Sequence, residues 1–136
     1  NGLLYSSLSD IYLTLNQYQT AVDLLLKAVK YDPDNSRNYG NLGWSFYMLN
    51  DNAECINYSL KAISIDPAAY YAGFNMAIAH LRSGNFSEAR RIYGLYSGKA
   101  SSIPEADRNG AAEDLKDLIS KGIYVKEIES ILKEFF

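Results

Sequence analysis

Two stretches of this chain repeat one another at a distance of 34 residues. The first reads LLKAVKYDP at residues 25–33, and the second reads SLKAISIDP at residues 59–67. Shifting the whole sequence by 34 positions aligns further residues of matching type, including small side chains and residues that favour turns. A fixed period of roughly 20 to 50 residues is the signature of a stacked array of similar structural units. The period therefore restricts the fold more than any other feature.

The aligned columns divide most of the chain into three units. These units run at about residues 2–35, 36–69 and 70–103. One column holds small side chains throughout, at Ala21, Cys55 and Ala89. A second small-residue column holds Ala28 and Ala62, but its third position is Tyr96. The third unit is therefore expected to pack differently at its end.

Each unit reads as two helices joined by a short turn. Apolar residues recur at helical spacing in both halves of the first unit, at Leu8, Ile11, Tyr12, Leu15, Ala21, Leu24, Leu25 and Ala28. Between the halves lies a column of residues that tolerate the left-handed backbone ending a helix, at Asn16, Asn50 and Gly84. Thr20 and Ser87 are expected to be N-caps or first-turn residues of the second helices. The Asp-Pro pairs at residues 32–33 and 66–67 should end those helices.

This pattern resembles the tetratricopeptide repeat over about residues 2–103. The middle unit carries the resemblance most fully, through Tyr39, Leu42, Gly43, Phe46, Ala62 and Pro67. The third unit keeps Gly84, Phe86 and Ala89 but has Gly73 where the family places an aromatic residue. The resemblance implies an all-α fold, a right-handed superhelical array of antiparallel helix pairs.

The period fails after residue 97, and the rest of the chain predicts two further helices. Ser101 or Ser102 is expected to cap a helix that starts at about Pro104 and stops at Lys121-Gly122. Apolar residues then follow helical spacing at Val125, Ile128, Ile131, Leu132 and Phe135. Because an array exposes an apolar face at its end, residues 104–136 are expected to be a C-terminal helical cap of the same domain. The alternative is a degenerate fourth repeat whose apolar face meets another chain.

Composition argues against several classes of function. The net charge is −3, which gives no support to nucleic-acid binding. No run of about 18 apolar residues exists to span a membrane. His80 stands in an aromatic column and Cys55 in an alanine column, so both are expected to be structural, and no metal, cofactor or enzyme active site is predicted. The single cysteine fits a reducing, cytoplasmic compartment weakly and leaves the location unknown.

The resemblance implies where a partner would bind. The first helices of such an array line a concave face, and the residues outside the packing columns should point into it. The predicted partner-binding residues are Arg37, Asn41, Trp44, Tyr47, Tyr71, Phe74, Asn75, Ile78 and Arg82. The aromatic members suit an apolar anchor of a peptide or helix, and the two arginines suit acidic groups. The alternative is that the C-terminal helices fold back over this patch.

One subset of the family binds the acidic C-terminal tails of chaperones through a clamp of Lys, Asn and Arg residues. The matching positions here are Ser6, Asp10, Asn41, Tyr71 and Asn75. Only Asn41 agrees, and Asp10 would repel a carboxylate. No binding of such tails is therefore predicted.

The most direct interpretation is a scaffold or adaptor module for protein–protein interaction, cut from a longer protein. A second hypothesis is self-association through an exposed apolar end, at Leu3 and Leu4 or at Phe135 and Phe136. A third is a regulatory segment of a larger multidomain enzyme.

Overall fold

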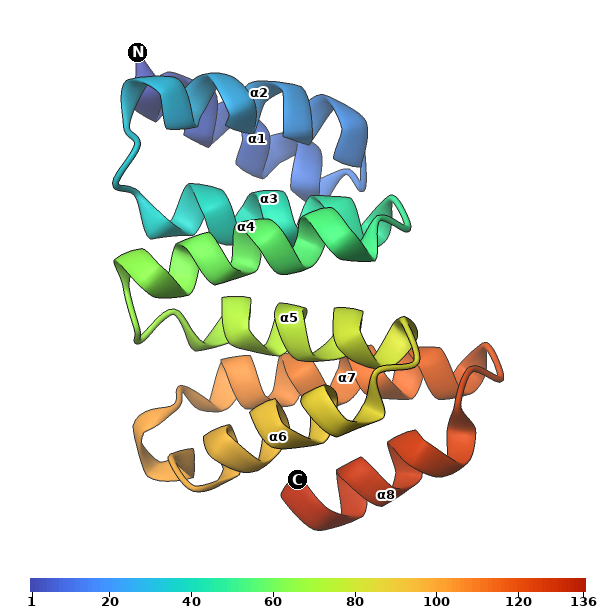
Figure 1. Cartoon of the computed structure of the whole chain (residues 1–136). Helices are drawn as coiled ribbons and strands as arrows, with labels where there is room; N and C mark the ends of the chain where they lie inside the picture. Colours follow the sequence, from blue (N-terminus) through green and yellow to red (C-terminus); the bar gives the residue numbers. More distant parts are fainter.

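The computed structural model describes all of residues 1–136 and consists of helices joined by short connections (Figure 1). Three helix pairs are formed by α1 (Gly2–Thr14), α2 (Tyr18–Tyr31), α3 (Ser36–Met48), α4 (Asn52–Ile65), α5 (Tyr70–Arg82) and α6 (Phe86–Ser97). A short 3-10 helix (Ala100–Ser102) leads to α7 (Glu105–Ser120) and α8 (Val125–Phe135). Each helix from α1 to α6 packs against the next, which confirms the predicted all-α array of helix pairs. No helix combines the length and the apolar character needed to cross a bilayer.

The turn inside each pair depends on one residue with a left-handed backbone. Asn16, Asn50 and Gly84 have φ angles of 57°, 64° and 83°. Asparagine and glycine adopt this conformation at low cost, whereas a bulky side chain would be strained there. The column of asparagine and glycine at 34-residue spacing therefore reflects the reversal between the two helices of each pair.

The second helices begin slightly earlier than the sequence suggested. The side chains of Asp51 and Asn85 accept the backbone N–H three residues ahead, at 3.1 and 3.4 Å, and so cap α4 and α6. Gln17 holds the same place before α2 without a side-chain hydrogen bond. Thr20 and Ser87 were expected to be either N-caps or first-turn residues. They lie in the first turns of their helices and are not the caps.

The Asp-Pro pairs end the second helices as predicted. α2 ends at Tyr31 and α4 at Ile65, each one residue before the aspartate. The two aspartates have φ angles of −137° and −133°, because a following proline disfavours helical geometry. The small-residue columns lie between helices, where Ala21, Cys55, Ala89, Ala28 and Ala62 are all 0% exposed.

Two departures in the third unit compensate each other. Tyr96 stands in the alanine column, and Gly73 stands in the column that holds tyrosine in the first two units. A Cβ atom at residue 73 would overlap the Tyr96 phenol. The Tyr96 ring therefore occupies the space that Gly73 leaves empty, and it packs edge-on against Phe74 at a ring-centre distance of 5.1 Å. The aromatic group has moved from the first helix of the unit to the second.

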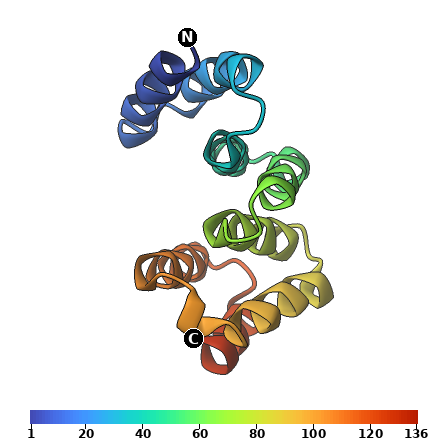
Figure 2. The ribbon, with the colours of Figure 1, turned by 90° about the vertical axis from the view of Figure 1, so that its left-hand side faces the viewer.

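The C-terminal helices pack against the third pair. α7 lies along α5, and α8 contacts both α6 and α7 (Figure 2). Their buried apolar residues are Ala111, Leu115, Leu118, Ile128 and Ile131. On these contacts we propose that residues 104–136 close the C-terminal end of the array as part of the same domain. The prediction that Ser101 or Ser102 caps α7 is wrong, because Ile103 and Pro104 separate the serines from Glu105.

The turn after α7 is held against the third pair. α7 ends at Ser120, and Gly122 has a φ angle of 72°, which confirms the predicted helix stop. Tyr124 also has a left-handed backbone, with a φ angle of 44°. Its ring packs edge-on against Phe86 at a ring-centre distance of 4.9 Å. This aromatic pair fastens the connection between α7 and α8 to the start of α6.

The Gly73–Tyr96 exchange predicts a sharp sensitivity to size. Gly73→Ala should lower the free energy of unfolding by about 2 kcal/mol, because the added methyl group overpacks a filled contact. Chemical denaturation measures this loss. The second substitution Tyr96→Ala should recover part of it, since it removes the group that the methyl meets.

Gly110→Ala is the matched control for this prediction. Gly110 also lies inside a helix, but nothing stands within 4 Å of the added Cβ. Alanine should therefore stabilise the protein by about 0.5 kcal/mol through its higher helix propensity. Equal effects of the two glycine substitutions would contradict the proposed exchange.

Candidate functional site

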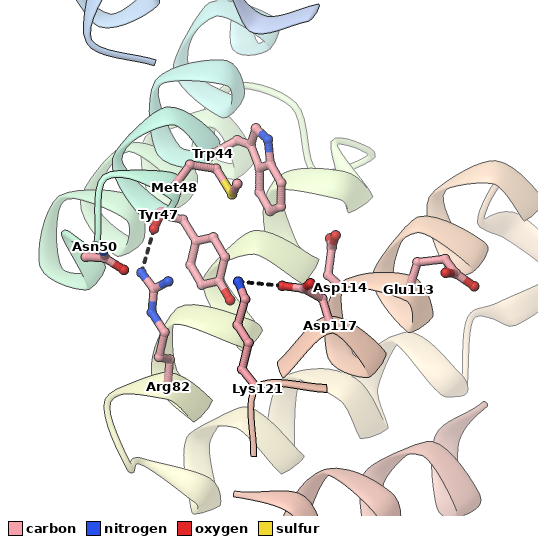
Figure 3. Close-up of a pocket in the computed structure, with 9 residues that line it drawn as sticks. All are labelled: Trp44, Tyr47, Met48, Asn50, Arg82, Glu113, Asp114, Asp117 and Lys121. Carbon is pink, nitrogen blue, oxygen red and sulfur yellow. Dashed lines mark hydrogen bonds and ion pairs between the residues drawn. The ribbon is translucent and has the colours of Figure 1, made fainter. Parts of the chain in front are cut away.

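The array curves so that its first helices form a concave face. In Figure 2, α1, α3 and α5 follow the inner side of the curve, and α7 closes its lower end. The largest hollow in the structure, of about 470 Å³, lies between α3, α5 and α7 and is called the central pocket here (Figure 3). It is lined by Trp44, Tyr47, Met48, Asn50, Arg82, Glu113, Asp114, Asp117 and Lys121.

One wall of the central pocket is aromatic. Trp44 and Tyr47 are one helical turn apart on α3, and their rings stack with centres 5.3 Å apart and planes at 18°. Tyr47 is buried, and this burial raises the pKa of its hydroxyl to about 12. Trp44 is half-buried and Met48 is exposed, so both present apolar surface to the pocket.

Arg82 braces this wall. Its guanidinium lies over the Tyr47 ring, 3.7 Å from the ring centre. One terminal nitrogen donates to the Tyr47 carbonyl oxygen at 2.6 Å, and Nε donates to the Asn52 side-chain oxygen at 2.7 Å. The arginine thus joins α5 to the end of α3 and the start of α4 through two of its three guanidinium nitrogens.

The opposite wall, on α7, is acidic. Asp117 pairs with Lys121 at 2.8 Å, and Glu113 pairs with Lys116 at 3.7 Å. Asp114 lies between them with no ion pair and no side-chain hydrogen bond. Partial burial, helped by the charges of Asp117 and Glu113, raises the pKa of Asp114 to about 6. The pocket therefore contains one partly buried carboxylate that lacks a cation.

The remaining predicted residues fall into two groups. Arg37, Asn41 and Tyr71 line a second hollow of about 410 Å³ beside the start of α3, and Arg37 is ion-paired with Asp10 at 3.1 Å. Phe74, Asn75 and Ile78 are 6%, 8% and 2% exposed. Phe74 and Asn75 line a small hollow of about 150 Å³ that α7 covers, and its far side includes Asp114.

The structure thus brings Trp44, Tyr47 and Arg82 together in the central pocket and places Phe74 and Ile78 in the interior. Of the two arrangements considered from sequence, the C-terminal helices do fold over the α5 part of the concave face. The open part is bounded by α3 and α7. The partner-binding role of the nine residues stays a prediction.

Sequence reasoning missed the acidic wall, although one signal for it exists. Asp114 lies three residues after Ala111 and four before Leu118, so it stands on the buried stripe of α7. A carboxylate on an otherwise apolar stripe is uncommon, because burying an unpaired charge is costly. That position distinguishes Asp114 from the exposed acidic residues around it.

Fold and groove together define an α-solenoid of stacked helix pairs, a class of protein that acts through its surfaces. Residues 4–35 and 36–68 match the family described as Tetratricopeptide repeat. Residues 4–68 are therefore two tetratricopeptide repeats, and repeats of this family are protein-interaction modules. No curated protein matches the sequence.

Solved structures with this fold are similar to the chain at low sequence identity. The TPR2B domain of yeast Sti1, in a pHsp70 complex, has a TM-score of 0.67 and 22% identity, and the match covers 96% of this chain and 91% of that one. The Sgt2 TPR domain of Aspergillus fumigatus has a TM-score of 0.71 and 17% identity, with 89% and 80% covered. The first TPR of Spaghetti (RPAP3), bound to the HSP90 peptide SRMEEVD, has a TM-score of 0.71 and 17% identity, with 87% and 95% covered. At these identities, the similarity shows the fold.

The environment of Asp114 predicts a gain of stability on neutralisation. Its raised pKa means that folding disfavours the ionised form, so the carboxylate costs stability above about pH 6 and the cost disappears as the pH falls toward 4. Asp114→Asn should raise the free energy of unfolding by about 1 kcal/mol at pH 7.5, after allowance for partial exposure, and should leave it unchanged near pH 4. Urea denaturation at both pH values measures this.

Glu129→Gln on α8 is the control, because Glu129 is exposed and the substitution makes the same chemical change. It should alter stability little at either pH. A loss of stability in Asp114→Asn at pH 7.5 would show that the carboxylate has a stabilising partner.

Proposed function

We propose that this chain is a protein-interaction module whose concave groove binds a segment of a partner protein through an apolar anchor and a neighbouring cationic side chain. The observation that carries the proposal is the unpaired carboxylate of Asp114 opposite the Trp44–Tyr47 stack. The match of residues 4–68 to the tetratricopeptide repeat supports the general role, and the pocket supports the proposed ligand chemistry.

A lysine or arginine side chain matches both walls of the central pocket. Its aliphatic stem would lie against Trp44 and Met48, and its charged end would reach Asp114. A cation close to an aromatic face gains further attraction from the ring. Binding would also remove the free-energy cost of the unpaired charge. The Asp114 carboxylate would therefore destabilise the free protein but not the complex, and this difference would favour binding.

The second hollow extends the surface available to the same segment. Asn41 and Tyr71 line this second hollow. Tyr71 also lines the small hollow under α7 that contains Phe74 and Asp114, so the two hollows are adjacent. An extended peptide running along α3 would therefore meet the Asn41 amide at one end and the acidic, aromatic pocket at the other. We assign peptide recognition to this line of hollows rather than to the buried side chains of Phe74 and Ile78.

An acidic segment fits this groove poorly. The two arginines expected to receive it are engaged, since Arg37 pairs with Asp10 and Arg82 with Tyr47 and Asn52. The clamp position Ser6 is nearly buried and donates its hydroxyl to Asn38 at 2.8 Å. Carboxylates entering the groove would instead face those of α7.

Selection from a random-peptide phage library tests the proposal without a known partner. The enriched sequences should carry Lys or Arg next to an aromatic or aliphatic residue. For a selected peptide, fluorescence anisotropy should show that Asp114→Asn weakens binding about tenfold, because a charge-assisted contact is lost, and that Trp44→Ala weakens it by a similar factor.

Glu105→Gln is the control for binding, since it neutralises an acidic residue of α7 outside the central pocket. It should leave the affinity unchanged. Selected peptides that lack cationic residues, or that bind Asp114→Asn as tightly as the original chain, would refute the assignment.

The peptide SRMEEVD should not bind this chain. Calorimetric titration with about 50 µM protein should give no saturable heat, because the groove presents unpaired negative rather than positive charge. Micromolar binding would overturn this prediction and would show that Arg37 or Arg82 leaves its present partners.

A further inference from the structure

The outward face of α1 is an apolar stripe that nothing in the structure covers. The stripe consists of Leu4, Leu8 and Ile11, spaced by four and three residues along one side of the helix. Leu4 and Ile11 are 56% and 55% exposed, and Leu8 is partly buried. The single charged residue of α1, Asp10, is already ion-paired with Arg37. The first helix of the array therefore lacks the polar outer face that ends a stable solenoid.

The internal repeat shows what the stripe is built to contact. The residues 34 positions later are Asn38, Leu42 and Ser45, which are 2%, 0% and 0% exposed. Another 34 positions on, Ala72 and Ala79 are 0% exposed, and Met76 is partly buried. The columns of Leu4 and Ile11 are thus buried in α3 and α5 and open only in α1, and the Leu8 column between them is partly or fully buried throughout. The column four residues further along each helix lies outside this helix–helix contact, since Leu15, Leu49 and Ser83 are all exposed.

The helix that buries these columns is the second helix of the preceding pair. α2 packs on α3, where Val22 and Leu25 of α2 share a core with Leu42 of α3. Val29, also on α2, packs against that core. α4 packs on α5 in the same way, and Ile63 contacts the cluster that contains Ala72. The covering helix therefore presents aliphatic side chains three and four residues apart.

From this equivalence we infer that the outer face of α1 is a stacking interface that takes the second helix of a further tetratricopeptide-type helix pair. The interface continues the α2–α3 and α4–α5 contacts by one more step. Because Leu4 and Ile11 are larger than Ala72 and Ala79, the incoming helix should carry small side chains opposite them. This surface is distinct from the concave groove, so its occupation leaves the central pocket free.

The test supplies such a helix pair from the chain itself. A copy of residues 35–68 placed directly before Asn1 preserves the 34-residue period and sets a second α4 against α1. Two versions are made, one with the natural sequence and one with Ile56→Ala and Ile63→Ala in the appended copy, to match the larger side chains of α1. At least one extended protein should melt about 5 °C above the original chain and should protect the appended amides from hydrogen exchange.

Ile11→Asp provides the matched control. In the original chain it changes an exposed residue and should leave the melting temperature nearly unchanged. In the extended chain it would bury a charge and should abolish the gain. Absence of any gain in both extended proteins would overturn the inference. Sedimentation velocity of the original chain completes the test, because a dimer lost in Ile11→Asp would mean that a second copy, not a repeat helix, covers the stripe.

Discussion

Close approach of two helices requires a small side chain on at least one of them, and the rest of this structure depends on that requirement. Ala21, Cys55 and Ala89 meet it in all three pairs, and each is completely buried. Once the helices lie close, the left-handed turn residue and the Asp-Pro stop set their length and direction. The concave face, the stacking stripe and the end of the array then follow from the same contact made three times.

The third pair shows that volume matters more than the identity of the residue in a column. Tyr96 and Gly73 each break the repeat pattern when considered alone, and together they restore the packed volume. A filled core is sensitive to added atoms at one position but tolerant of an exchange between neighbours. The end of α6 can thereby differ from α2 and α4 while the helix pair is kept.

Much of the fold could be predicted from sequence because its determinants are local. Asn16, Asn50 and Gly84 each determine one turn. In each Asp-Pro pair, the proline restricts the backbone of the aspartate before it. The sequence left open whether the C-terminal helices fold back over the concave face, because the period ends at residue 97 and an amphipathic helix does not specify the surface that it covers. For that reason an open aromatic groove was one of two predicted arrangements, whereas Phe74 and Ile78 are buried. The role of the arginines was equally inaccessible, since free and engaged guanidinium groups look alike in a sequence.

The aromatic contact between Tyr124 and Phe86 bears on the proposed binding of a partner in the groove. It fastens the end of α7 to the third pair, while Ile103, which is 6% exposed, anchors the segment before α7. A helix held at both ends is a fixed wall and not a lid. In the proposed complex, the groove is therefore organised before the partner arrives, and little conformational entropy of the protein would be lost on binding. The affinity should then depend on the shape and charge of the incoming segment. Most of the conformational entropy lost on binding would be that of the partner.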